Sequence, residues 1–221
     1  MIGKTNSGII LAILNISAAK SCTVTLTQSG RAFRFSGTGT YMSFKLPTAG
    51  TWTVTTQFNG YTEVKTVTLS PGEVRNLTVL DALYLYNRGA YLSGFGTGWS
   101  RGEEANRIIV WRNTFASSGT DATSNGTANL NNVRTIRIEF EAGIYAEPDT
   151  NFGSEGRIRL KDASGNVLTA KQWAFGHATH NAAHTWDVDV SDISAAKFSI
   201  WVNGGNGSAQ MIIYSIRLIP G

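Results

Sequence analysis

The chain has 221 residues, of which 42% are apolar and 15% charged, and a formal net charge of +4. This length and apolar fraction exclude a disordered chain and allow one large or two small domains. The sequence has no apolar run of about 18 residues, no Lys/Arg-rich run and only one cysteine, Cys22. These features argue against a transmembrane helix, a nucleic-acid partner, an internal disulfide and a cysteine-rich zinc site.

The first apolar stretch, residues 9–14, follows Lys4 near the N-terminus. It is short for the apolar region of a signal peptide, and Asn15 interrupts it. We therefore interpret it as a first β-strand. A lone thiol fits the same interpretation, because disulfides are rare in the cytoplasm. We expect the chain to fold in the cytoplasm without a cleaved signal peptide.

Residues 1–80 show alternation with the period of a β-strand. Trp52, Val54 and Thr56 share one face of a predicted strand, and threonines fill the other face. Asn59-Gly60 is a strong signal for a hairpin turn. About seven short strands separated by turns predict a small antiparallel β-sandwich for this part of the chain.

Three segments of residues 1–80 also carry a resemblance: Phe44-Lys45-Leu46-Pro47, residues 50–55 (Gly-Thr-Trp-Thr-Val-Thr) and residues 65–69 (Lys-Thr-Val-Thr-Leu). The pattern resembles a small module of tail and baseplate proteins of phages and prophages of Firmicutes. That module is similar to the carboxypeptidase-regulatory and PEGA-like sandwiches. The resemblance covers about residues 15–80. It implies a spacer or attachment domain on a virion or extracellular surface, beside other virion or surface proteins.

Residues 81–221 differ in composition and pattern. Glycine-rich and polar loops come first, and a series of segments with clear strand alternation follows. Ile136, Ile138 and Phe140 alternate with polar residues, and so do Phe198 and Ile200. About eight strands and no amphipathic helical pattern predict a jelly-roll-like sandwich of two sheets. The fold class is therefore all-β, and we place the boundary between the two domains after residue 80.

The second part resembles the carbohydrate-binding jelly rolls, the galactose-binding-like group among them. The resemblance rests on strand order and on the terminal strand, residues 211–218 (Met-Ile-Ile-Tyr-Ser-Ile-Arg-Leu). It implies a glycan of a cell surface as the ligand. Oligomerisation of the chain stays open.

The aromatic and arginine pattern gives candidate ligand-binding residues. Trp201 is out of phase with Phe198, Ile200 and Val202, so it faces the polar side of its strand, where an indole can stack on a sugar ring. The alternative is that Trp201 is buried against the other domain, a subunit or a loop. Further candidates are arginines at polar positions and aromatic residues of a glycine-rich loop: Arg137, Arg157, Arg159, Arg217, Tyr91, Phe95 and Trp99.

Two groups of residues are candidate metal ligands. His177, His180 and His184 are the only histidines, and a cluster of imidazoles can bind zinc or nickel. The alternative is a polar surface loop that binds no metal or only an adventitious one. Residues 147–151, or Asp187 with Asp189 and Asp192, can supply oxygen ligands for a structural calcium ion. We expect no other cofactor.

Signals of catalysis are weak. The sequence lacks the GxSxG, HExxH and P-loop motifs. Glu139 and Glu141 share one strand face, but such pairs are ordinary on solvated strands. We therefore expect a non-catalytic phage or prophage tail protein, or a cell-surface accessory protein, that binds a carbohydrate. The alternatives are a purely structural virion-assembly protein and a fragment of a glycan-processing enzyme.

Overall fold

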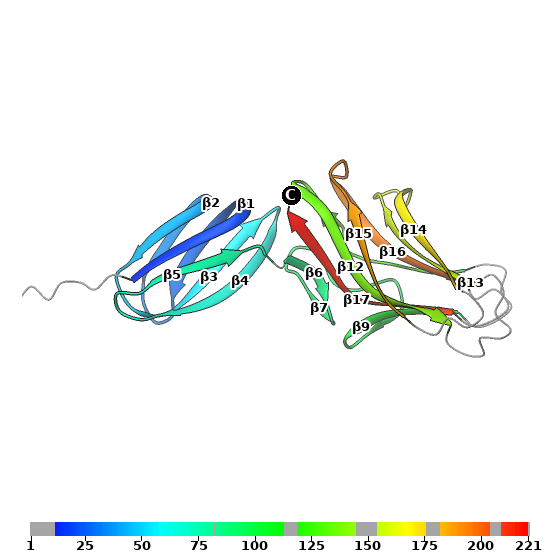
Figure 1. Cartoon of the computed structure of the whole chain (residues 1–221), viewed down its shortest axis with the longest axis horizontal. Coiled ribbons are helices and arrows are strands. Elements are labelled where there is room, and N and C mark those ends of the chain that lie inside the picture. Colours follow the sequence, from blue (N-terminus) through cyan, green and yellow to red (C-terminus); the bar gives the residue numbers. More distant parts are fainter. Residues whose placement is uncertain are drawn as a thin grey trace, which may run out of the picture. The chain divides into compact units, whose positions relative to one another are not determined.

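The computed structural model describes residues 12–81, 83–112, 119–144, 154–175, 182–203 and 209–220. Within these ranges every regular element is a β-strand (Figure 1), which confirms the predicted all-β class. The chain divides into two compact units, Met1–Asp81 and Ala82–Gly221. In the described ranges no helix has the length and apolar character needed to cross a membrane.

The first unit is one five-stranded sheet in the order β2-β1-β3-β4, with β5 paired to β1. The pairing of β1 with β5 is parallel, whereas the other pairings in this unit are antiparallel. The register of β1 shifts between Ser17 and Cys22, so its first half pairs with β5 and its second half with β3. The strands are β1 (Ala12–Gln28), β2 (Arg34–Leu46), β3 (Gly50–Phe58), β4 (Tyr61–Leu69) and β5 (Val74–Val79).

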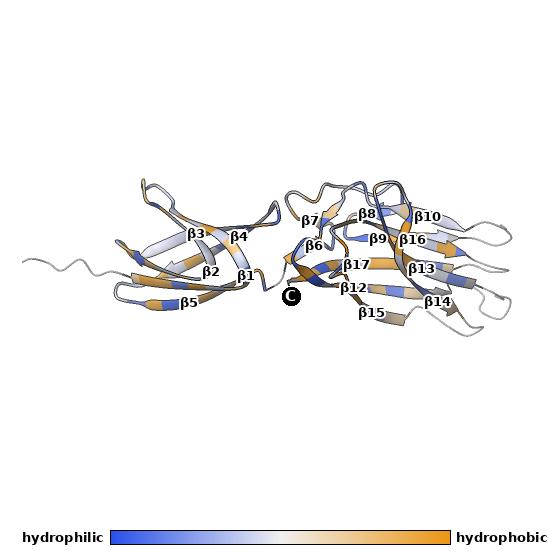
Figure 2. Cartoon of the chain, turned by 90° about the horizontal axis from the view of Figure 1, so that it is seen from above, coloured by the Kyte–Doolittle hydropathy of each residue, from blue (hydrophilic) through white to orange (hydrophobic). Residues whose placement is uncertain are grey.

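The core of this unit follows the predicted alternation. Trp52, Val54 and Thr56 are buried, and the indole N–H of Trp52 donates to the Thr48 carbonyl oxygen at 3.3 Å. Asn59 and Gly60 both have positive φ, 51° and 81°, as the predicted two-residue hairpin turn requires. The alternation appears in Figure 2 as hydrophobic and hydrophilic bands along the strands.

The second unit is a sandwich of two sheets (Figure 1). The larger sheet has seven strands, in the order β15-β12-β17-β6-β7, with β9 paired to both β17 and β8. All its pairings are antiparallel. The strands are β6 (Leu83–Asn87), β7 (Ala90–Tyr91), β8 (Glu103–Glu104), β9 (Arg107–Arg112), β12 (Val133–Ile144), β15 (Ala182–Asp189) and β17 (Ala209–Pro220).

The smaller sheet has five strands, in the order β10-β16-β13-β14, with β11 paired to β16. A Cβ atom added to Gly156 on β13 would lie 2.3 Å from Sδ of Met211 on β17, so the two sheets approach closely at this glycine. The strands are β10 (Thr120–Thr123), β11 (Ala128–Asn129), β13 (Ser154–Lys161), β14 (Val167–Phe175) and β16 (Ala195–Asn203).

The strand period places apolar side chains between the two sheets and polar ones on their outer faces. Ile138 of β12, Ile158 of β13 and Ile200 of β16 are fully buried. Glu139 and Arg157 alternate with these core residues. The sandwich therefore has two outer faces that point away from each other, one on each sheet.

Candidate functional site

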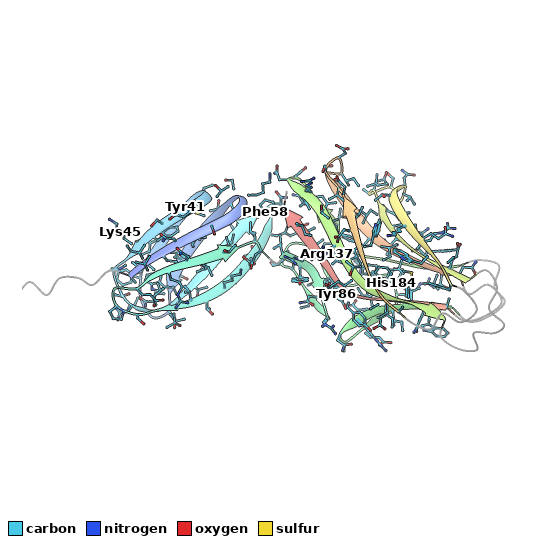
Figure 3. All side chains as sticks on the ribbon, in the orientation of Figure 1. Tyr41, Lys45, Phe58, Tyr86, Arg137 and His184 are labelled. Atoms are coloured by element: carbon cyan, nitrogen blue, oxygen red, sulfur yellow. The ribbon has the colours of Figure 1, made fainter. Side chains whose placement is uncertain are left out.

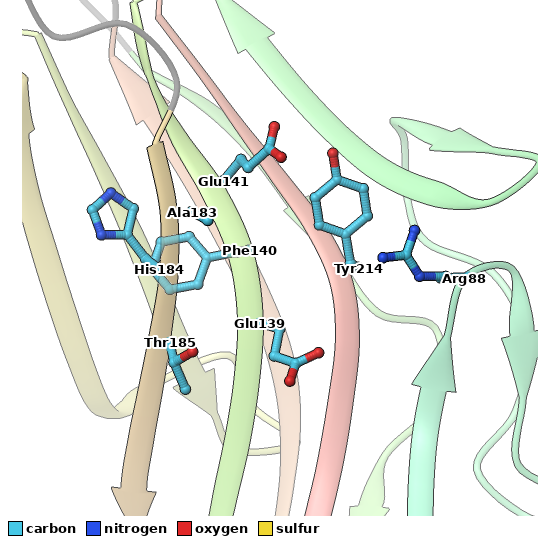
Figure 4. A pocket seen from close by; sticks show the side chains of 8 residues that line it. All are labelled: Arg88, Glu139, Phe140, Glu141, Ala183, His184, Thr185 and Tyr214. Atoms are coloured by element: carbon cyan, nitrogen blue, oxygen red, sulfur yellow. The ribbon is translucent and has the colours of Figure 1, made fainter.

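A pocket of about 470 Å³ lies on the outer face of the larger sheet. Three neighbouring strands, β15, β12 and β17, contribute to it together with the turn between β6 and β7 (Figure 4). The residues that line it are Arg88, Glu139, Phe140, Glu141, Ala183, His184, Thr185 and Tyr214. Since most of them belong to paired strands, the backbone holds the pocket in place.

A β-bulge in β17 brings Tyr214 to this face. Glu139 pairs with Ser215 and Phe140 with Ile213, so the register passes over Tyr214. A bulge re-aims side chains next to the extra residue. As a result Tyr214 lines the pocket, while Ser215 Oγ, on the same side of the sheet, donates a 2.8 Å hydrogen bond to Glu139 Oε2.

The second carboxylate of the pocket, Glu141, interacts with Tyr214. Burial, the charge of Glu141 and a hydrogen bond to its side chain raise the pKa of Tyr214, while the charges of Arg107 and Arg88 act against that rise. The Tyr214 hydroxyl therefore stays protonated at neutral pH and donates to the carboxylate.

Arg88 closes the pocket on the side of β6. Arg88 and Gly89 form the two-residue turn between β6 and β7, and both have positive φ, 45° and 89°, which is typical of a type I′ turn. The guanidinium carbon of Arg88 lies 5.1 Å from the centre of the Tyr214 ring. Figure 4 shows Tyr214 between Arg88 and the two glutamates. The turn thus places a planar donor beside an aromatic ring.

The core side of the same strands supports the pocket. The rings of Phe140 and His184 stack with their centres 5.3 Å apart, and Trp173 packs against Phe140 at 4.6 Å. Phe140 and Trp186 are buried. Trp186 thus belongs to the core, and aromatic packing holds β12 and β15 in place beneath the pocket.

The structure separates the arginines that the sequence singled out. Arg157 pairs with Trp201, and Arg159 lies two residues further along β13, on the smaller sheet. Arg137 and Arg217 pair with each other on β12 and β17 of the larger sheet. These residues belong to opposite outer faces, so they do not form one site.

Trp201 lies on the outer face of the smaller sheet, half-buried rather than open. The guanidinium carbon of Arg157 lies 4.7 Å from the centre of the indole ring. Gly119 touches the same ring, since a Cβ atom on Gly119 would lie 2.1 Å from Cε2 of Trp201. Both contacts come from within the unit, so the indole is already engaged by its neighbours.

Asp121 is the centre of a network on this second face. Its carboxylate accepts hydrogen bonds from Ser199 Oγ at 2.6 Å, from an Arg159 Nη at 2.7 Å and from Lys161 Nζ at 2.8 Å. On the same face Arg157 donates to Glu155 at 2.9 Å. The arginines of this face are thus committed to carboxylates of the chain.

On the larger sheet the predicted arginines also have partners. Arg137 donates two hydrogen bonds to the Asp187 carboxylate, at 2.8 and 2.7 Å. The Arg217 guanidinium carbon lies 5.8 Å from the centre of the Tyr84 ring. Both pairs lie on the outer face that also holds the pocket. Figure 3 shows Arg137 on β12.

The three aromatic residues that the sequence pattern placed in a glycine-rich loop do not form an open platform, and Tyr91 belongs to β7. Phe95 and Trp99 are only 2% and 6% exposed. Their rings are therefore not accessible to a sugar, and the prediction that they bind the ligand is wrong for these two residues. Phe95 packs edge-on against Phe198 of the core. Tyr91 donates from its hydroxyl to Glu103 at 2.7 Å. The loop folds back because its aromatic side chains complete the core.

The metal candidates fall partly beyond the described ranges. His177 and His180 lie outside the described residues, as do residues 147–151. His184 belongs to β15, not to a loop, and stacks on Phe140. Asp189 accepts hydrogen bonds from Ser191. In the part of the chain that the structure describes, no group of three His, Cys, Asp or Glu side chains is placed to hold a metal ion.

Comparisons with known proteins give fold likeness alone. No family model and no curated protein matches the sequence. One similar solved structure is an arabinose-bound MgGH51 α-L-arabinofuranosidase, with 12% identity and a TM-score of 0.37; the match covers 50% of this chain and 19% of that chain. Another is TmCBM61 in complex with β-1,4-galactotriose, with 11% identity and a TM-score of 0.34; the match covers 54% of this chain and 73% of that chain. A third is a carbohydrate-binding module of the β-sandwich superfamily (15% identity, 91% and 85% coverage, TM-score 0.35). At these TM-scores the likenesses assign no residue of this chain a role.

Proposed function

We propose that the Ala82–Gly221 unit binds a neutral carbohydrate, without catalysis, through the pocket on the larger sheet. One observation carries the proposal: the pocket combines the ring of Tyr214 with two carboxylates, Glu139 and Glu141, and the guanidinium of Arg88. An aromatic ring with a few well-placed polar groups is typical of small-ligand sites.

The chemistry of these groups suits a sugar. A pyranose presents hydroxyls at its rim and C–H groups on its faces. Carboxylate oxygens accept hydrogen bonds from hydroxyls, an arginine fork donates to them, and an aromatic ring packs on the C–H face. Two carboxylates, Glu139 and Glu141, line the pocket together with one guanidinium, that of Arg88. Arg107 also interacts with Glu141, but it is already paired with Glu104 at 2.7 Å. This balance favours an uncharged ligand over an acidic one.

The placement of the carboxylates supports binding rather than hydrolysis. Glycosidases place two carboxyl groups on opposite sides of the scissile bond. Glu139 and Glu141 stand two residues apart on one strand and one face. Each is also engaged within the chain, Glu139 by Ser215 and Glu141 by Tyr214. A fragment of a glycan-processing enzyme is the less favoured alternative.

For the whole chain we propose the role of a phage- or prophage-type tail protein, or of a cell-surface accessory protein. In this proposal the Met1–Asp81 unit serves as an attachment or spacer domain. The resemblance of residues 15–80 to tail and baseplate modules supports this role. The alternative is a structural assembly protein without a small ligand. Antibody labelling of intact virions and of producing cells tests the location, and labelling of neither contradicts it.

The binding test uses the full chain on an array of neutral and acidic glycans, with variants of both outer faces. Tyr214→Ala removes the ring of the pocket, and Tyr214→Phe keeps the ring but removes its hydroxyl. Trp201→Ala is the matched change on the smaller sheet. We expect Tyr214→Ala to weaken binding about tenfold, Tyr214→Phe to weaken it less, and Trp201→Ala to leave it unchanged.

The outcomes separate the alternatives. Binding that is lost in Trp201→Ala and kept in Tyr214→Ala moves the site to the smaller sheet. Absence of any bound glycan favours the structural assembly role. Release of reducing sugar from a bound glycan, lost in Glu139→Gln or Glu141→Gln, contradicts the non-catalytic proposal.

A further inference from the structure

Trp111 is an exposed aromatic residue on the same face as the pocket, and sequence reasoning gave it no role. Its side chain is 53% exposed. It belongs to β9, where its neighbours Ile108 and Val110 point into the core and are buried. A large apolar ring that is exposed next to buried residues of the same strand is unusual for tryptophan.

The register places Trp111 in line with the pocket. Trp111 pairs with Gln210 on β17, and Ile109 pairs with Ile212. Ile212 in turn pairs with Glu141 on β12, which lines the pocket. Directly paired residues share one face of a sheet. Trp111, Ile109 and Glu141 therefore lie on one continuous outer face that crosses three strands.

The distance along this face exceeds the reach of one sugar ring. Gln210, which pairs with Trp111, precedes Tyr214 of the pocket by four positions along β17. At the rise of an antiparallel strand this is roughly 13 Å. Between the two aromatic residues the face carries Ile109, half-buried, and Ile212, buried. The accessible apolar surface beside the pocket therefore belongs to β9, where Ile109 is half-buried and Trp111 is exposed.

We infer that Trp111 forms a second contact point of the carbohydrate site, so that the larger sheet binds a chain of several sugars rather than a single one. This inference rests on the proposed function. A chain of sugars that starts in the pocket passes Ile109 on β9 and packs its C–H groups on the indole of Trp111. Two rings on paired strands are preorganised for an extended ligand, which lowers the entropy lost on binding.

The test compares short and long probes on the full chain. The probes are glucose, galactose, mannose and xylose and their linear homo-oligomers of about two to six residues, titrated by calorimetry. The variants are Trp111→Ala, Tyr214→Ala and, as an exposed aromatic control in the first unit, Tyr41→Ala, which removes a ring that is 65% exposed. Thermal unfolding of each variant checks that the fold is intact.

We expect wild type to bind oligomers of the recognised sugar more tightly than the monomer. Trp111→Ala should lower the affinity for the longer oligomers about five- to tenfold and leave the monomer unchanged. Tyr214→Ala should lower the affinity for the monomer and for the oligomers. Tyr41→Ala should change neither affinity. Oligomer binding that depends on Tyr214 but not on Trp111 overturns this inference alone. Loss of monomer and oligomer binding alike in Trp111→Ala also overturns it. If no probe binds wild type, the proposed function fails first and the inference with it.

Discussion

The guanidinium of Arg88 and the ring of Tyr214 lie against each other, 5.1 Å apart, and the backbone N–H of Arg88 donates to the Tyr214 carbonyl oxygen at 2.9 Å. The two contacts join the turn between β6 and β7 to the bulge of β17. A turn and a bulge, neither of which belongs to the regular ladder, therefore set the geometry of the pocket.

The first prediction concerns the turn. Gly89 has φ +89°, and a Cβ atom there would lie 2.1 Å from the Ala105 carbonyl oxygen. Gly89→Ala should destabilise the protein by about 2–4 kcal/mol, because backbone strain and a clash act together. Gly165→Ala is the control, since Gly165 also has φ +89° but has nothing within 4 Å. Equal unfolding free energies of the two variants in urea would show that the clash relaxes at no cost.

The second prediction concerns Asp121, which accepts hydrogen bonds from Ser199, Arg159 and Lys161. Asp121→Asn leaves two cations that are only 16% and 15% exposed without their carboxylate. We expect a loss of about 1–2 kcal/mol in unfolding free energy, since Asp121 is itself partly exposed and screened. Asp187→Asn, which breaks an exposed pair, should cost about 0–1 kcal/mol. A smaller loss for Asp121→Asn than for the control would contradict the network.

The same network gives a pH dependence. Burial raises the pKa of Asp121, but hydrogen bonds from Lys161 and Ser199 and the charge of Arg159 outweigh it, so the net pKa is lowered. A lowered folded-state pKa contributes stability above the ordinary value of 3.8, and this contribution is lost as pH falls through the folded value. The stability difference between wild type and Asp121→Asn should therefore shrink below about pH 4 in acid titrations of unfolding. A difference that stays constant to pH 2 would exclude this linkage.

The third prediction concerns Cys22, which is 4% exposed and lies on the same buried side of β1 as Val24 and Leu26. Burial, followed by the charge of Glu63, raises the pKa of the thiol, so little thiolate forms at neutral pH. Labelling by a thiol reagent should be slow in the native protein and fast in denaturant. Native labelling as fast as that of a free thiol in a peptide would place Cys22 at the surface.

The fourth prediction concerns Trp201. Its contacts with Arg157 and Gly119 are internal to the unit, so Trp201→Ala should reduce unfolding free energy by about 1–2 kcal/mol. Trp201→Phe should restore part of this loss. Thermal and urea unfolding measure both variants, and a neutral Trp201→Ala would mean that the indole is free for another partner.

The alternation of apolar and polar residues within each strand was sufficient to predict many of the core residues. Trp52, Val54, Phe198 and Ile200 are core residues because a strand alternates with period two, and this period is visible in the residues themselves. The two positive φ values of Asn59 and Gly60 follow from a dipeptide that tolerates them. The parallel pairing of β5 with β1 was missed, because it joins segments that no hairpin connects.

The site depended on information that the local pattern lacks. Sequence determined that Arg137, Arg157 and Arg217 point away from the core, but only the tertiary structure decided which of the two outer faces each one occupies. Strand pairing is a long-range choice, whereas alternation is a property of each strand alone. Tyr214 reaches the pocket because β17 gains one residue against β12, and a bulge of this kind depends on the partner strand. The sequence thus determined the side of each strand that meets water, and the packing of the sheets decided which of those sides form a site.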